Sequence, residues 1–199
     1  MKFCLSLILI VCIGYGNLAE IQQRCQSNFN KCIIKTHNKL RALHQSPPLV
    51  EDSNLKTIAL EYSQKMAREN KLIDNPRLNE LSLGENLGLS YNFKGFDMNK
   101  CGQLGKSYAE KWYSEIENWD FIKSKGKNTR HFTQVVWKDT KKIGCGLAIG
   151  SNGKKAYITC NYDPPMNGDY SLNVKQNSIL LNRNDEEDPD CDFNGSEEF

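Results

Sequence analysis

The sequence predicts an α+β domain, with helices in its first half and short antiparallel strands in its second. Apolar residues recur at helical spacing over residues 29–43, 54–70 and 104–119, and from residue 131 onward they alternate along the chain as they do in strands. Of the 199 residues, 39% are hydrophobic and 25% are charged, which is an ordinary balance for one globular domain.

Residues 1–19 are expected to form a secretory signal peptide. In MKFCLSLILIVCIGYG, Lys2 precedes an apolar run over residues 3–13, and small residues follow, so that cleavage is predicted after Gly16 or Ala19. The run is too short to span a bilayer comfortably, and no later stretch approaches the roughly eighteen apolar residues of a membrane helix. We therefore expect a secreted, extracellular protein with no transmembrane segment.

The net charge of +2 falls to +1 once Lys2 leaves with the signal peptide. Such a small excess gives no electrostatic reason to expect nucleic acid or an anionic membrane as a partner. The last segment, residues 181–199, is acidic and has no core pattern, and we interpret it as a tail tied back at Cys191. It includes Asn194 in the sequon Asn-Gly-Ser, a candidate glycosylation site.

Three helices are predicted before the strands. The first ends before the Pro47-Pro48 pair, and the second begins after Asp52 or Ser53, either of which can cap it. Residues 71–106 then carry Asn, Gly, Pro and Asp without sustained periodicity, so a long and functional loop region is expected there. An aromatic-rich third helix begins near Leu104.

Three strands are predicted after the helices. The run HFTQVVW at residues 131–137 alternates, with His131 at its head, and further strands are expected over residues 143–149 and 156–162. Between the last two lies Asn152-Gly153, which suits a two-residue type I′ hairpin turn. A turn centred there pairs residues whose numbers sum to 305, and this places Cys145 opposite Cys160.

Six cysteines remain after removal of the signal peptide, and in an oxidising compartment they are expected to form three disulfides. The hairpin register makes the bridge from Cys145 to Cys160 the firmest of them. The other four cysteines permit three pairings, of which we prefer Cys32 to Cys101 and Cys25 to Cys191. None of the spacings is CxxC, which argues against a zinc ribbon or a thioredoxin-like site.

Chemistry-bearing residues are few. Besides His131 they include two other histidines, His37 and His44, and the carboxylates of Asp74, Glu85 and Glu115. Glu115 shares the apolar face of the predicted third helix, where an isolated charge is costly, and His131 is one natural partner for it.

Five segments, in order, resemble the landmarks of the CAP superfamily (cysteine-rich secretory, antigen 5 and pathogenesis-related-1 proteins, also called SCP/TAPS). They are THNKLRA, LGENLG, KWYSEIENW, HFTQVVWKDTKKIGCGLA and YITCNYDPPMNGDY, and the resemblance covers roughly residues 30–170. The cysteines and the short tail are most similar to the venom allergen-like proteins secreted by parasitic worms, with a schistosome as the expected source.

This resemblance implies a three-layer α-β-α sandwich over residues 20–180, with a central cavity lined by two histidines and two glutamates. Carried over by motif, the cavity set is Glu85, Glu115 and His131, with Asp74 where the family has its second histidine. His37 matches a different family position. In the family the histidines are the metal ligands, and Asp74 leaves only one of the two here. We therefore expect that no cofactor is required and that a divalent cation binds weakly at most to His131, Glu85 and Glu115.

The resemblance also implies lipid binding, our leading interpretation. CAP proteins bind fatty acids in a channel between helices and sterols through an aromatic loop. Here the corresponding loop, LSYNFKGFDMNKC, carries Tyr91, Phe93, Phe96 and Met98.

A secreted effector or allergen that binds a host plasma or receptor protein through its loops, with a vestigial cavity, is the alternative. A hydrolase is disfavoured, because no GxSxG elbow occurs and the cysteines are expected to be bonded; no catalytic residue is therefore assigned.

Overall fold

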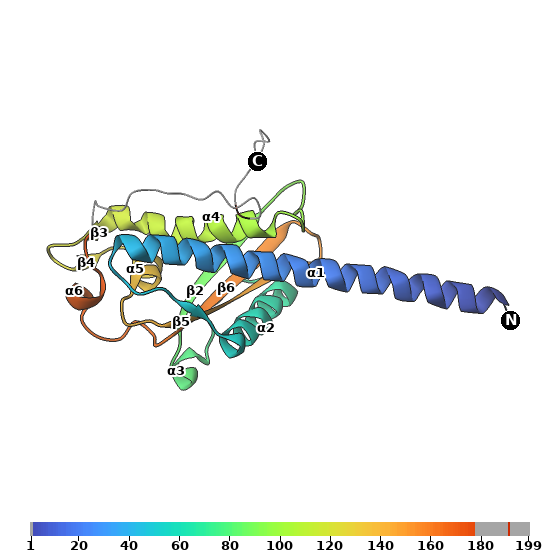
Figure 1. Cartoon of the computed structure of the whole chain (residues 1–199), viewed down its shortest axis with the longest axis horizontal. Coiled ribbons are helices and arrows are strands. Elements are labelled where there is room, and N and C mark those ends of the chain that lie inside the picture. Colours follow the sequence, from blue (N-terminus) through green and yellow to red (C-terminus); the bar gives the residue numbers. More distant parts are fainter. Residues whose placement is uncertain (1, 178–190, 192–199) are drawn as a thin grey trace.

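A four-stranded sheet lies between two helical layers in the computed structural model, which describes residues 2–177 and Cys191, with side chains from residue 19 onward (Figure 1). The strand order is β1 (Val50–Glu51), β5 (Lys142–Ile149), β6 (Lys155–Asp163) and β2 (Gly84–Tyr91). Strand β1 runs parallel to β5, and the other pairs are antiparallel. The predicted three-layer α-β-α sandwich is confirmed.

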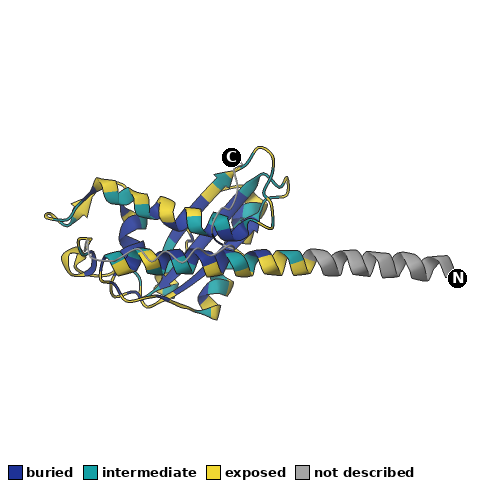
Figure 2. Cartoon of the chain, turned by 45° about the horizontal axis from the view of Figure 1, so that its top comes forward, coloured by how far each residue is buried: buried dark blue, intermediate teal, exposed yellow. Residues whose placement is uncertain are grey.

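Helix α2 (Ser53–Glu69) covers one face of the sheet, and helices α1 (Lys2–Leu43), α4 (Cys101–Tyr113) and α5 (Arg130–Val136) cover the other. Glycines let the layers approach closely: a Cβ on Gly144 would meet the backbone of α2, 2.1 Å from the amide nitrogen of Lys56. A Cβ on Gly105 in α4 would lie 2.6 Å from the carbonyl oxygen of Phe29 in α1. Figure 2 shows buried residues concentrated between the layers.

The remaining elements are short. Helix α3 (Leu78–Leu81) precedes β2, and the 3-10 helix η1 (Ser114–Asn118) continues α4. A two-stranded hairpin of β3 (Trp119–Asp120) and β4 (Lys125–Gly126) lies between η1 and α5, and helix α6 (Tyr170–Asn173) follows the sheet. Asp52 is the N-cap of α2, one of the two residues expected there. The predicted tail, residues 181–199, and Asn194 lie outside the described residues apart from Cys191.

The β5–β6 register agrees with the prediction, although the turn does not. Cys145 pairs with Cys160 and the two form a disulfide. Gly150 and Lys155 still bond across the hairpin, with 2.8 Å between the amide nitrogen of Gly150 and the carbonyl oxygen of Lys155. Four residues therefore form the loop rather than two, and Gly153 alone among them has a positive φ, 71°. The four-residue loop has the same centre as the predicted two-residue turn, so the predicted register is correct although the predicted turn is not.

The preferred pairing of the other cysteines was wrong. Cys25 is bonded to Cys101, and Cys32 is bonded to Cys191. Helices α1 and α4 run in the same direction, and joining Cys101 to Cys32 would slide them past each other by seven residues, roughly 10 Å. The sequence shows both cysteines on one face of α1 but not which of them lies beside the start of α4.

Two predicted elements were also wrong. HFTQVVW forms α5 rather than a strand, and the expected long loop contains α3 and β2. Residues 132–136 are all buried, so an alternation of apolar residues no longer distinguishes two faces, and Phe132, Val135 and Val136 equally fit the i, i+3, i+4 spacing of a helix. In β2, the two glycines and the polar Glu85 and Asn86 hide the alternation that a strand usually shows.

Arg41 joins the end of α1 to the end of α5. Its side chain is fully buried and donates hydrogen bonds of 2.8–3.0 Å to four backbone carbonyls. Burial lowers the pKa of its guanidinium to about 10, which still leaves it charged at neutral pH. Two of the acceptors, the carbonyls of Val135 and of the C-cap residue Trp137, lie at the C-terminal end of α5, where a helix leaves carbonyls unpaired and favours a cation.

The close contact of α1 and α4 predicts that a methyl group added at Gly105 destabilises the protein. Gly105→Ala favours a helix by up to about 1 kcal/mol on intrinsic propensity, yet its Cβ would press on the carbonyl of Phe29. We expect a net loss of about 1–3 kcal/mol in the free energy of unfolding, measured by urea denaturation. Gly150→Ala is the control, because its Cβ meets nothing closer than 3.6 Å. A more stable Gly105→Ala protein would show that the helices are not in backbone contact.

Candidate functional site

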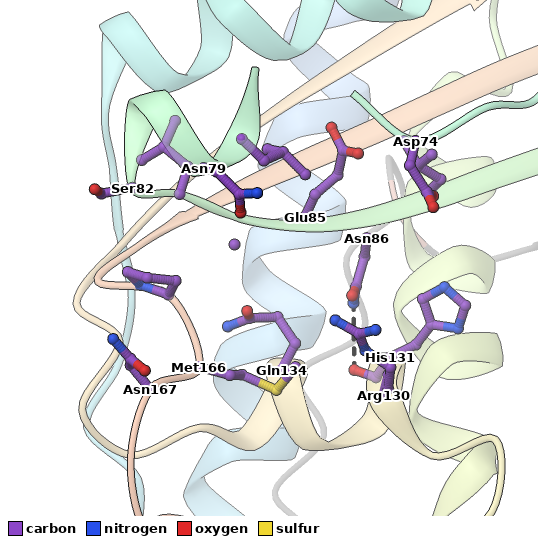
Figure 3. A pocket seen from close by; sticks show the side chains of 15 residues that line it. Asp74, Asn79, Ser82, Glu85, Asn86, Arg130, His131, Gln134, Met166 and Asn167 are labelled. Atoms are coloured by element: carbon purple, nitrogen blue, oxygen red, sulfur yellow. Dashed lines mark hydrogen bonds between the residues drawn. The ribbon is translucent and has the colours of Figure 1, made fainter. Parts of the chain in front are cut away.

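A pocket of about 670 Å³ lies at the free edge of β2 (Figure 3). Asp74, Glu85 and His131 from the predicted cavity set line it, and Glu115 does not. Its other lining residues come from α3, from β2 and its approach, from α5 and from the loop after β6: Leu78, Asn79, Ser82, Leu83, Gly84, Asn86, Leu87, Arg130, Gln134, Pro165, Met166 and Asn167.

The pleat of β2 divides this site into two halves. Leu87 packs with residues of α2, whereas Gly88 lies against the ring of Tyr108 in α4. Because side chains alternate along a strand, Glu85 shares the α2 side and Asn86 shares the side of α4 and α5. Figure 3 shows Glu85 and Asn86 pointing away from each other across the strand.

The first half contains two carboxylates. The hydroxyl of Tyr62 in α2 donates to the carbonyls of Ile73 and Asp74, which fixes the loop before α3. The next amide, of Asn75, donates to Glu85 Oε1 at 3.1 Å. Burial raises the pKa of Glu85 to about 7, and the nearby negative charge of Asp74 adds to the rise, against the opposing hydrogen bonds from Asn75 and Asn161. Glu85 is therefore a carboxyl group that titrates near neutral pH.

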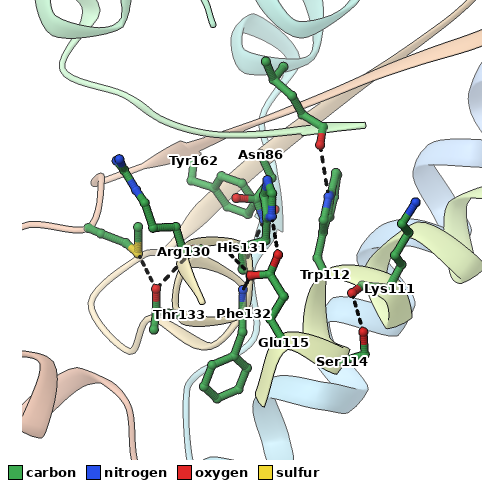
Figure 4. A network of polar contacts seen from close by, with 12 residues as sticks. Asn86, Lys111, Trp112, Ser114, Glu115, Arg130, His131, Phe132, Thr133 and Tyr162 are labelled. Atoms are coloured by element: carbon green, nitrogen blue, oxygen red, sulfur yellow. Dashed lines mark hydrogen bonds and ion pairs between the residues drawn. The ribbon is translucent and has the colours of Figure 1, made fainter. Parts of the chain in front are cut away.

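The second half is built on Glu115. Its Oε1 lies 2.6 Å from His131 Nδ1, and its Oε2 accepts from the backbone amides of His131 at 3.0 Å and Phe132 at 3.2 Å (Figure 4). These amides belong to the first turn of α5, which leaves N–H groups unpaired and favours an anion. One carboxylate thus holds both the helix and the ring, and the indole of Trp112 stacks on that ring at 6.1 Å.

A chain of buried hydrogen-bonded groups also supports the half of the site that contains His131. Asn86 Nδ2 donates to the carbonyl of His131 and to the hydroxyl of Tyr162, both at 3.2 Å. Because His37 Nδ1 donates to the carbonyl of Ile33, its Nε2 accepts from the Tyr162 hydroxyl at 2.9 Å. Burial lowers the pKa of His37 to about 4, which keeps the ring neutral as this role requires. Sequence reasoning missed Asn86 and Tyr162, because nothing in their spacing along the chain joins them.

His37 and His44 are structural rather than lining residues. His44 joins the carbonyl of Lys175 at 2.6 Å to the hydroxyl of Tyr113 at 2.9 Å. Of the loop candidates, Tyr91 and Phe93 are exposed, whereas Phe96 and Met98 pack against the core.

The residues present do not fit a metal ion. Among the described residues, no three His, Cys, Asp or Glu side chains are placed to hold one. The reason is the division at β2. Glu85 lies on the α2 side, and His131 lies on the other side, where its Nδ1 is bonded to Glu115 and its Nε2 is the one ring nitrogen left to bind an ion. Asp74 in place of an imidazole leaves a single histidine in the pocket.

A three-layer α-β-α sandwich with a bonded glutamate and histidine beside its sheet defines the class of the protein, a CAP domain. The comparison with known families agrees: residues 34–162 match the family described as "CAP: Cysteine-rich secretory protein family". The chain belongs to this family.

Relatives in several kingdoms share the domain. The chain is 37% identical over 140 residues to the human Golgi-associated plant pathogenesis-related protein 1, covering 70% of this chain and 84% of that protein. It is 32% identical over 144 residues to the secreted protein RBT4 of Candida albicans, covering 71% of this chain but 36% of the relative. Neither name describes an enzyme.

A solved structure shows the same fold. Venom allergen-like protein 4 of Schistosoma mansoni superposes with a TM-score of 0.55 at 22% identity, covering 75% of this chain and 95% of that one. This likeness concerns the fold alone, so the expected origin in a parasitic worm stays a prediction. Of the helices described here, none is long and apolar enough to cross a membrane.

The raised pKa of Glu85 predicts a pH-dependent stability. The folded protein holds the Glu85 proton up to a pH of about 7, whereas the unfolded chain releases it near 4.5. The contribution of Glu85 to the free energy of unfolding therefore falls as the pH rises from about 4.5 to about 7, and it stays constant at higher pH. Glu85→Gln removes this contribution, so its Tm should rise relative to that of the wild type between pH 4.5 and pH 7.5. A Tm difference that stays constant over this range would contradict the buried carboxyl.

Proposed function

We propose that this chain is a secreted lipid-binding protein that binds sterols through the end of β2 and the loop that follows it. The observation that carries the proposal is the exposure of two aromatic side chains, 60% for Tyr91 and 76% for Phe93. Large exposed aromatic groups cost free energy in water and commonly mark a surface that binds an apolar partner. The predicted signal peptide and three disulfides support secretion.

One side of this loop is anchored to the core, and the other side is exposed to solvent. Its backbone bonds to the β5–β6 turn, with the amide of Asn92 donating to the carbonyl of Lys154 and the amide of Phe96 donating to that of Gly153, both at 2.9 Å. Phe96 packs against the core, whereas Phe93 points outward with Lys154 Nζ 4.7 Å from its ring centroid. A ring held outward by a fixed loop needs little reordering to bind a flat apolar molecule.

The packing favours this loop over a fatty-acid channel between helices. The contact of Gly105 with Phe29 leaves no space for an acyl chain between α1 and α4 at that level. On the other face, Gly144 and Gly146 bring α2 against the sheet in the same way. Hydrolysis is not supported, since no serine or cysteine among the described residues is hydrogen-bonded to the ring of His131.

Substitution of the two exposed rings tests the proposal. Tyr91→Ala with Phe93→Ala should weaken the binding of radiolabelled cholesterol at least about tenfold, because both apolar faces are lost. Both side chains are exposed, so the fold should be kept, which thermal melting would verify.

Phe96→Leu and Ile122→Ala are the controls for sterol binding. The first changes a ring on the anchored side of the loop, and the second removes an exposed apolar side chain from another part of the surface. If the double variant binds cholesterol as the wild type does, the proposal fails. The exposed rings would then be assigned to a host protein, and a pull-down from plasma with the same variant would identify it.

A further inference from the structure

The β3–β4 hairpin presents the most exposed large hydrophobic side chain among the described residues. Ile122 is 95% exposed, compared with 76% for Phe93. It stands at the tip of the hairpin, between Asp120 and Lys125, the last residues that pair across it. Neither the pocket nor the loop after β2 uses this side chain.

The tip is held in shape by its own side chains. Asp120 Oδ1 accepts from the amides of Ile122 and Lys123, both at 3.0 Å. The neighbouring Phe121 turns the other way, packs against the core and stacks on the ring of His44 at 6.2 Å. With Phe121 anchored inward and the turn fixed by Asp120, Ile122 is directed into solvent.

Positively charged residues follow this apolar tip along the chain. The segment KSKGKNTR over residues 123–130 contains four cations and no acid, which the net charge of the whole chain conceals. Lys123, Lys125 and Lys127 are exposed, and Lys123 is paired with Asp120 at 3.3 Å. Lys125 and Lys127 make no ion pair with any described residue. The exposed acid nearest along the chain, outside the hairpin, is Glu117 in η1.

We infer that the β3–β4 hairpin docks this protein on anionic lipid membranes, with Ile122 entering the interface and Lys125 and Lys127 meeting the lipid phosphates. A nucleic acid or a sulfated polysaccharide would satisfy the lysines but offers nothing to an isoleucine at the tip. An apolar protein groove would accept the isoleucine but has no need of unpaired lysines. An anionic bilayer satisfies both, since it places negative headgroups directly above hydrocarbon.

This surface is separate from the loop proposed to bind sterol. The loop precedes the first residue of α4, and the hairpin follows η1 beyond the last, so they lie at opposite ends of a helix of 13 residues, roughly 20 Å long (Figure 1). Docking on anionic lipid therefore stands independently of sterol binding, and sterol-free vesicles test it alone.

Vesicle flotation with the complete secreted chain tests the inference. The protein should float with vesicles of phosphatidylcholine containing 30% phosphatidylserine and not with phosphatidylcholine alone. Lys125→Ala with Lys127→Ala should weaken binding roughly 25-fold, about fivefold for each charge. Ile122→Ser should weaken it roughly tenfold and leave its salt dependence unchanged.

Matched substitutions elsewhere on the surface are the controls. Val50→Ser replaces another exposed apolar residue, 66% exposed, and Lys71→Ala with Lys94→Ala removes two other exposed lysines. All of these variants should float as the wild type does. Binding that is unchanged in Ile122→Ser, equal for the two vesicle types, or lost equally in the control variants would overturn the inference. Retention on heparin that needs the lysines but not Ile122, without flotation, would overturn it in favour of an acidic polymer.

Discussion

The pleat of strand β2 is the constraint on which the arrangement of the site depends. β2 is an edge strand, so the pocket reaches around it, and consecutive side chains are directed to opposite sides. Glu85 lies with Asp74 on the α2 side, and Asn86 lies with His131 on the side of α5. A one-residue slip of β2 against β6 would exchange these two environments, and the antiparallel register from Gly84 to Tyr91 prevents it.

The contacts of α5 orient His131. Glu115 satisfies two amides of α5 and the Nδ1 of the ring, and Asn86 fixes the carbonyl of the same residue. Arg41 secures the other end of α5. A short helix of this kind is marginal in isolation, and here it is stabilised by the burial of residues 132–136 and by a carboxylate and a guanidinium at its two ends. The position of the histidine is therefore a property of the fold.

The sequence predicted the elements whose pattern is local. The register of Cys145 and Cys160 followed from alternation and the position of one turn, and α2 followed from a cap and an apolar stripe. Helix α5 was mistaken for a strand because it is short and its residues 132–136 are all buried, so no contrast between an apolar and a polar face reveals its period. The two remaining disulfides could not be assigned, because Cys25 and Cys32 lie on the same side of α1 and only the relative position of α4 separates them.

The sequence predicted only part of the candidate site. The resemblance of motifs named Asp74, Glu85, Glu115 and His131, but not the division of this set by the strand. Asn86 and Tyr162 come from separate strands and meet His37 only in three dimensions. The lysines of residues 123–127 are present in the sequence, but the hairpin was not predicted and the net charge argued against a membrane. The exposure of Ile122 could not be predicted either, because it depends on which way Phe121 turns.

Calorimetric titration of zinc tests the central claim, that β2 keeps the carboxylates of the α2 side from sharing one ion with His131. The account predicts no submicromolar site in the wild type and no change in the heats on His131→Ala. A submicromolar affinity that disappears in His131→Ala and is also reduced in Glu85→Gln would show that the two halves act as one site, in contradiction to the geometry described above.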